Sequence, residues 1–135
     1  MDEEISKNLS KTGTLTIGLV CKDGIVLAAD RRVTYGAQGG GVSYIASTAK
    51  KIWELNDQII GTMAGTVSDA IKTTSYLRAE IRLRDLRTKK LTTVSEAANL
   101  LANMNFHNIR TPSMIPAIAH FLLAGRDSSG SRLYD

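Results

Sequence analysis

The chain has 135 residues and a formal net charge of +4, and 43% of its residues are hydrophobic while 22% are charged. This length and composition indicate one globular domain with a core of its own, and they exclude a disordered chain. No apolar run approaches the roughly 20 residues that cross a bilayer, and the acidic-polar N-terminus lacks the apolar segment of a secretory signal.

The cysteine, histidine and glycine content narrows the chemistry further. A single cysteine, Cys21, excludes an internal disulfide framework and fits a reducing compartment, so we expect a cytoplasmic protein. His107 and His120 have no partners at metal-ligand spacing, so neither a metal nor a cofactor is expected. The glycine-rich stretch 36–41 lacks the ending of a phosphate loop and is interpreted as a surface loop.

Basic residues crowd one segment in the middle of the chain, namely Arg78, Arg82, Arg84, Arg87, Lys89 and Lys90. A nucleic-acid interface would need interleaved aromatic side chains or a recognised binding module, and this segment has neither. The pattern favours a solvated or subunit-facing helix end, where cations also suit the helix dipole. A small α+β binding module that uses the basic end is kept as an alternative function.

The N-terminal half of the chain is predicted to be β-structure. Residues 14–21 and 25–30 are two apolar runs joined by a tight turn, which predicts a hairpin. Both runs are continuously apolar rather than alternating, so we expect a sheet covered on both faces. Further short strands are predicted after a glycine-rich loop at 37–42, at residues 44–48, 51–55 and 58–64.

Two helices are predicted next. The first starts near Ser68, a good N-cap with Asp69 in the first turn, and runs to about Arg87. The second starts at Thr93 or Ser95 and ends before the next proline. The apolar stripe of the first helix consists of Ile71, Thr74, Leu77, Ile81 and Leu83.

The C-terminal part returns to β-structure, with a strand at 115–123, a turn at 127–130 and the start of a partner strand at 132–135. Strands, two adjacent helices and strands again predict a layered α+β architecture with both helices on one face of a sheet. The last strand stops without a cap, turn or polar tail, so we expect the chain to be a truncated version of a longer one.

The most informative local feature pairs two strand ends. Gly13-Thr14 opens the first strand after a short polar leader, and Asp30-Arg31-Arg32 closes the second. Cleavage at a Gly-Thr junction releases a threonine whose own α-amine can act as the catalytic base. On this interpretation residues 1–13 are a propeptide, and residues 14–135 form the domain of a threonine protease.

The chain resembles the proteasome β-subunit of archaeal type in the stretches 13–32 (GTLTIGLVCKDGIVLAADRR), 49–52 (AKKI) and 61–65 (GTMAG). The helix-rich stretch 68–109 and residues 125–134 (GRDSSGSRLY) also resemble it in order and spacing. The resemblance begins at residue 13 and corresponds to roughly the first two-thirds of a family member. It implies the N-terminal-nucleophile hydrolase fold, a four-layer αββα sandwich that is incomplete here at the C-terminal end.

The resemblance also implies a set of catalytic residues, which are Thr14, Asp30, Arg32, Lys51 and Gly65. Thr14 corresponds to the nucleophile, Asp30 to the acidic residue after the second strand, and Arg32 to the arginine that supports it. Lys51 corresponds to the lysine beside the threonine hydroxyl, where an ammonium would favour the alkoxide. The backbone N–H of Gly65 corresponds to the group that stabilises the oxyanion.

Substrate-binding residues follow from the same match. Val33, Ala49, Met63 and Val67 correspond to the pocket for the residue before the cut, and all four are apolar. A hydrophobic or medium aliphatic side chain is therefore expected there, although Met63 could instead simply fill core. Thr34 corresponds to a residue whose backbone pairs with an extended substrate.

The implied function is that of a 20S proteasome core β-subunit, a threonine-type endopeptidase that degrades unfolded proteins inside a stacked-ring chamber. The implied partners are other β-subunits, α-type rings and, through those rings, an ATP-dependent unfoldase. The alternative is a non-catalytic β-type ring or assembly subunit with the same fold, which an uncleaved Gly13-Thr14 junction would indicate.

Two departures from the family pattern stand out. The spacing from Thr34 to Lys51 is longer than usual, with the surplus at 37–42. The family's later segments supply a further serine and aspartate near the threonine and two more helices, and these segments have no counterpart in the sequence.

Overall fold

The structure, a computed structural model, describes residues 13–35, 44–114 and 117–135. The glycine-rich loop predicted at 37–42 therefore lies outside the described residues, as does most of the predicted propeptide. The hairpin predicted at the start of the domain is confirmed: β1 (Thr16–Val20) pairs antiparallel with β2 (Ile25–Ala29). A backbone hydrogen bond of 2.8 Å from Cys21 N to Gly24 O closes its turn.

Two further sheets are present among the described residues. One joins β3 (Arg32–Tyr35) to β4 (Tyr44–Thr48), and β3 is a strand that the sequence analysis did not predict. The other has four antiparallel strands in the order β5-β6-β7-β8, whose bounds are Ile52–Asn56, Ile59–Gly65, Ala119–Asp127 and Gly130–Tyr134. The strand predicted from residue 115 begins at Ala119 instead.

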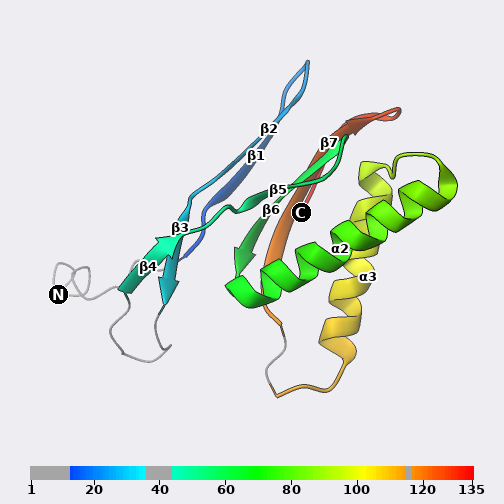
Figure 1. The fold of residues 1–135 in the computed structure, drawn as a ribbon. Helices are drawn as coiled ribbons and strands as arrows, with labels where there is room; N and C mark the ends of the chain where they lie inside the picture. The colour runs from blue at the N-terminus through cyan, green and yellow to red at the C-terminus, as the bar shows by residue number, and fades with distance from the viewer. Residues whose placement is uncertain (1–12, 36–43, 115–116) are drawn as a thin grey trace.

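Two helices cover one face of the four-stranded sheet (Figure 1). The first, α2 (Val67–Thr88), begins one residue before the predicted N-cap at Ser68, because Thr66 occupies the cap position. The second, α3 (Val94–Arg110), has the predicted Thr93 as its N-cap. The Thr93 side chain accepts from the Glu96 amide, and the Glu96 side chain accepts from the Thr93 amide, which satisfies two free backbone donors.

The core lies between these helices and the sheet. Its buried residues are Leu55, Ile59, Leu77, Ile81, Val94, Ala97, Leu101 and Leu123. On α2 the buried residues are Ala70, Thr74, Leu77 and Ile81, which are spaced four, three and four apart and so share one helix face. The predicted members Ile71 and Leu83 are instead exposed, because they lie at the sides of that face.

The β1–β2 hairpin lies on the opposite side of the four-stranded sheet from the helices, so the layers are strand, strand and helix (Figure 1). The packing is close, since a Cβ on Gly18 would lie only 2.8 Å from Leu133 of β8. The outward side chains Ile17, Leu19 and Val26 are exposed, so the expected cover on both faces is absent among the described residues. The predicted α+β class is confirmed, and these layers are three of the four in the predicted sandwich.

Within the described residues, neither helix is long and apolar enough to cross a membrane.

Candidate functional site

Three strand ends bring Thr14, Asp30 and Lys51 into direct contact. The Lys51 ammonium donates to Thr14 Oγ1 at 2.9 Å and to the two Asp30 carboxylate oxygens at 3.0 and 2.9 Å. Thr14 precedes β1, Asp30 follows β2, and Lys51 precedes β5, so pairing of the hairpin and its packing on the sheet place all three. The Lys51 side chain is only 6% exposed, whereas that of Asp30 is 32% exposed.

The Asp30 carboxylate is held by backbone groups as well as by Lys51. It accepts hydrogen bonds from the Leu15 amide at 3.0 Å and the Arg32 amide at 2.8 Å. Leu15 is the residue after Thr14, so Asp30 also fixes the backbone that carries the hydroxyl. Arg32, which the sequence analysis assigned as a support for Asp30, contacts it through its backbone N–H, and its side chain is exposed.

These contacts set the charge state of Asp30. Partial burial by itself raises the pKa of the carboxyl, but the hydrogen bonds from Lys51 and the Leu15 and Arg32 amides outweigh it and hold the pKa below its ordinary value of 3.8. Asp30 is therefore a carboxylate at neutral pH, and the Lys51 ammonium faces both a negative charge and the Thr14 hydroxyl.

This lowered pKa predicts how acid acts on stability. A carboxyl with a lower pKa in the folded state contributes stability above its unfolded pKa, and this contribution is lost as the pH falls through its folded pKa. We expect Asp30→Asn to lower the free energy of unfolding at neutral and weakly acidic pH, with the difference from wild type shrinking below about pH 3.8. Urea unfolding at a series of pH values measures this difference.

Asp23→Asn is the matched control, because Asp23 is an exposed residue in the turn of the same hairpin. The expectation is contradicted if the free energies of unfolding of wild type and Asp30→Asn differ more in acid than at neutral pH.

A small apolar pocket of about 20 Å³ opens beside the Thr14 hydroxyl. It contains all four residues that the sequence analysis assigned to specificity, together with three of the assigned catalytic residues. Ala64 and Ala70 also line it and were not predicted. The full lining is Thr14, Val33, Ala49, Lys51, Met63, Ala64, Gly65, Val67 and Ala70.

Thr34, the predicted substrate-pairing residue, lies in β3 and pairs with Ile45 of β4. In the described part of the chain β4 is the only strand paired with β3, so the second edge of β3 has backbone groups without a strand partner. An extended peptide can add to an edge of this kind.

Gly65 ends β6 at the rim of the pocket with a φ of +106°, a conformation that side chains rarely adopt. A Cβ there would lie 2.5 Å from the carbonyl oxygen of Ile118, so the position is closed by backbone and not by a flexible side chain. The neighbouring Thr66 amide donates to the same oxygen at 2.9 Å.

Gly65→Ala is expected to destabilise the protein more than Gly130→Ala does. Gly130 has an almost identical φ of +105°, but a Cβ there meets nothing within 4 Å, so it controls for backbone strain alone. The clash with Ile118 should add about 1–3 kcal/mol to the loss in the free energy of unfolding, measured in urea. Equal losses in the two variants would show that the Ile118 contact is unimportant.

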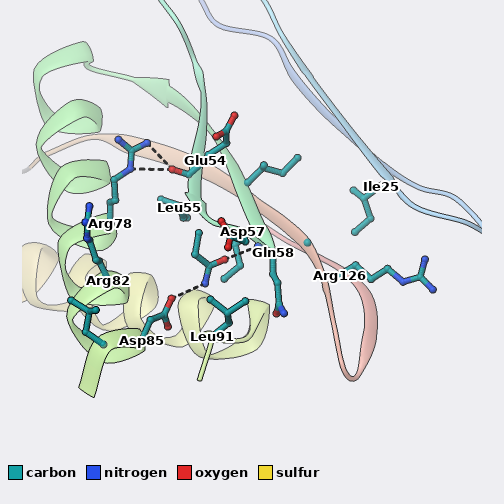
Figure 2. Close-up of a pocket in the computed structure, with 15 residues that line it drawn as sticks. Ile25, Glu54, Leu55, Asp57, Gln58, Arg78, Arg82, Asp85, Leu91 and Arg126 are labelled. Atoms are coloured by element: carbon teal, nitrogen blue, oxygen red, sulfur yellow. Dashed lines mark hydrogen bonds between the residues drawn. The ribbon is translucent and has the colours of Figure 1, made fainter. Parts of the chain in front are cut away.

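A larger cavity of about 690 Å³ lies at the other end of β5 and β6 and contains none of the assigned site residues (Figure 2). Its polar groups are largely used within the chain. The Arg78 guanidinium donates twice to the Glu54 carbonyl, at 3.0 and 2.7 Å, and lies over the Trp53 ring. Asp85 accepts from Asn56 and from Thr92. The contact between a lysine, a carboxylate and a hydroxyl is thus found at the small pocket and not at the large one.

No cluster of His, Cys, Asp and Glu side chains among the described residues is arranged to hold a metal ion.

Comparison with known proteins gives a consistent result. A family model described as proteasome subunit matches residues 10–135. Proteins named proteasome subunit beta are similar to this chain in Ferroglobus placidus, with 37% identity over 123 residues, and in Methanothermobacter thermautotrophicus, with 38% identity over 129 residues. These alignments cover 90% and 95% of this chain but 54% and 56% of the relatives. The chain therefore spans about half the length of the relatives, less than the two-thirds expected from its sequence.

Proposed function

Because the chain belongs to the proteasome subunit family, we propose that it is a β-type subunit of threonine-peptidase type, with Thr14 as the nucleophile. The observation that carries the proposal is the Lys51 ammonium, which contacts the Thr14 hydroxyl and the Asp30 carboxylate together. Held between a hydroxyl oxygen and a carboxylate, this ammonium favours loss of the hydroxyl proton.

The charge of the Lys51 side chain supports the proposed choice of base. An ammonium that donates to Thr14 Oγ1 cannot also accept the proton from that oxygen, so another group must take it. Cleavage of the Gly13–Thr14 bond would release an α-amine on the same residue, and we assign this amine as the base. In this proposal residues 1–13 are the propeptide, and residues 14–135 belong to the mature domain.

The proposed reaction proceeds in two steps. The Thr14 oxygen bonds to the substrate carbonyl carbon while its proton moves to the α-amine, and the Gly65 N–H stabilises the resulting oxyanion. The carbon–nitrogen bond then breaks, and the departing amine takes the proton. Water hydrolyses the ester left on Thr14, with the same α-amine accepting the proton of water, and the free hydroxyl returns.

The pocket volume refines the expected specificity. A cavity of about 20 Å³ is small, so we expect a small aliphatic side chain before the cut rather than an aromatic one. Met63, which is 4% exposed, is the largest apolar side chain in the lining. This position is compatible with the proposed pocket role and with a core role.

Met63→Ala is expected to shift the preference toward larger apolar residues before the cut. The ratio of kcat/KM for leucine over alanine substrates should rise about tenfold, since a change of this size in an apolar pocket has that effect. Met104→Ala, a methionine on α3 outside this pocket, is the matched control. An unchanged ratio in Met63→Ala would leave Met63 as core only.

The proposed setting is a ring of β-subunits between α-type rings, in the cytoplasm, where an ATP-dependent unfoldase supplies unfolded polypeptide. The test uses the full chain assembled with α-type subunits. Intact mass should show loss of residues 1–13, and an inhibitor that reacts covalently with N-terminal threonine should label one residue, Thr14. An assembled but uncleaved and unlabelled chain would favour the alternative, a non-catalytic ring subunit.

A further inference from the structure

Residues 117 and 118, which precede β7, are held by side chains from both helices. The Asn108 amide of α3 donates to the Ala117 carbonyl at 2.8 Å and accepts from the Ala117 N–H at 3.3 Å. The Asp69 carboxylate of α2 accepts from the Ile118 N–H at 3.2 Å. The paired strand of β7 starts only at Ala119, so these side chains take the place of a neighbouring strand.

Ile118 also supports the backbone at the candidate oxyanion site. Ile118 O accepts from the Thr66 amide at 2.9 Å and would lie 2.5 Å from a Cβ on Gly65. Gly65 is also paired with Ala119, the next residue along. A displacement of the segment at Ile118 therefore moves the Gly65 peptide, because no space separates the two backbones.

We infer that Asn108 and Asp69 are positioning residues that set the orientation of the Gly65 N–H toward the substrate. The chain of contacts runs from Asn108 and Asp69 to residues 117 and 118, and from these to Gly65 and Thr66. Neither side chain lines the pocket beside Thr14, so neither touches the reacting atoms. The inference deepens the proposed function and rests on it, since an oxyanion donor matters only if Thr14 attacks a carbonyl.

Each helix provides one of the side chains that hold residues 117 and 118. Asp69 lies in the first turn of α2, directly after the Gly65–Thr66 turn, and its negative charge suits that helix end. Asn108 lies in the last turn of α3, where its amide can both donate and accept. Only a side chain with both capacities can bridge the N–H and the C=O of Ala117.

The test compares Asn108→Ala with Asn105→Ala in the assembled particle. Asn105 is the same residue type about one turn earlier on α3, and among the described residues no side-chain hydrogen bond joins it to residue 117 or 118. We expect kcat to fall about tenfold in Asn108→Ala with KM within about twofold of wild type, because the donor acts on the oxyanion and not on bound substrate. Turnover is normalised to the number of Thr14 residues that the inhibitor labels.

Asp69→Ala should give the same split between kcat and KM, and Asp69→Asn should restore most of kcat because its amide oxygen can still accept from Ile118. A rise in KM with unchanged kcat, or equal kcat in the Asn108→Ala and Asn105→Ala variants, would overturn the inference. If the wild type itself cleaves no peptide and is not labelled, the proposed function fails first and this inference fails with it.

Hydrogen exchange at the Thr66 amide gives a readout that does not need activity. This N–H is bonded to Ile118 O, so loss of the Asn108 contacts should make it exchange about tenfold faster than in Asn105→Ala. Unchanged exchange in Asn108→Ala would show that Asn108 does not act on the Gly65–Thr66 turn, whatever the turnover.

Discussion

Thr14→Ala is expected to lower peptide hydrolysis by about 10³-fold or more and to leave residues 1–13 attached to the chain. Loss of a nucleophile leaves only the catalysis that binding and the oxyanion site supply. The Thr14 Oγ1 is also an acceptor of the Lys51 ammonium, so the variant removes that acceptor and keeps the Asp30 carboxylate. Intact mass and fluorogenic peptide turnover of the assembled particle measure the two effects.

Two control variants sharpen this result. Thr14→Ser keeps a hydroxyl at the same place and should retain cleavage and part of the turnover. Thr16→Ala removes a threonine hydroxyl two residues further along, in β1, and should leave both nearly unchanged. Full turnover in Thr14→Ala would exclude Thr14 as the nucleophile and with it the proposed function.

Lys51→Met is the second variant for which a large effect is expected, a loss of about 10²–10⁴-fold in kcat. Methionine keeps most of the volume of the side chain but removes the ammonium group that contacts both Thr14 and Asp30. The hydroxyl then loses the group that favours its ionisation, and the Asp30 carboxylate keeps only its two backbone donors. Active-site titration separates this loss of kcat from loss of folded protein.

Lys50→Met is the matched control, because Lys50 is the adjacent residue and its side chain is exposed. The same substitution there should change turnover by less than about twofold, as for most surface changes. If the two lysine variants behave alike, Lys51 has no special part in the reaction.

The candidate site was largely accessible from sequence, because it depends on strand ends. Thr14, Asp30 and Lys51 each flank an apolar run whose β-character is clear, and the resemblance supplied the order in which the runs meet. What it could not supply was the form of each contact. Arg32 contacts Asp30 through a backbone amide, and a residue type carries no signal for a bond that any residue can make.

The parts of the fold that were wrong or missed depend on long-range contacts. The start of β7 shifted to Ala119 because Asn108 and Asp69 bind the two residues before it, and a β-branched or apolar pattern contains no trace of such side-chain bonds. On α2, helical period alone could not distinguish Ala70 from Ile71 as the inward residue. Packing of the helix against the sheet determines that Ala70 is buried and Ile71 is exposed.

The separation of the site residues along the chain has a consequence for the folding of the protein. Lys51 contacts a hydroxyl 37 positions and a carboxylate 21 positions earlier, so the contacts form only when β1, β2 and β5 have come together. Contacts of this range carry a loop-closure cost that local structure does not repay, and a partly folded chain lacks them. If Thr14 is the nucleophile, as proposed, a nascent or misfolded chain would not cleave peptides, and activity would appear only in the native state.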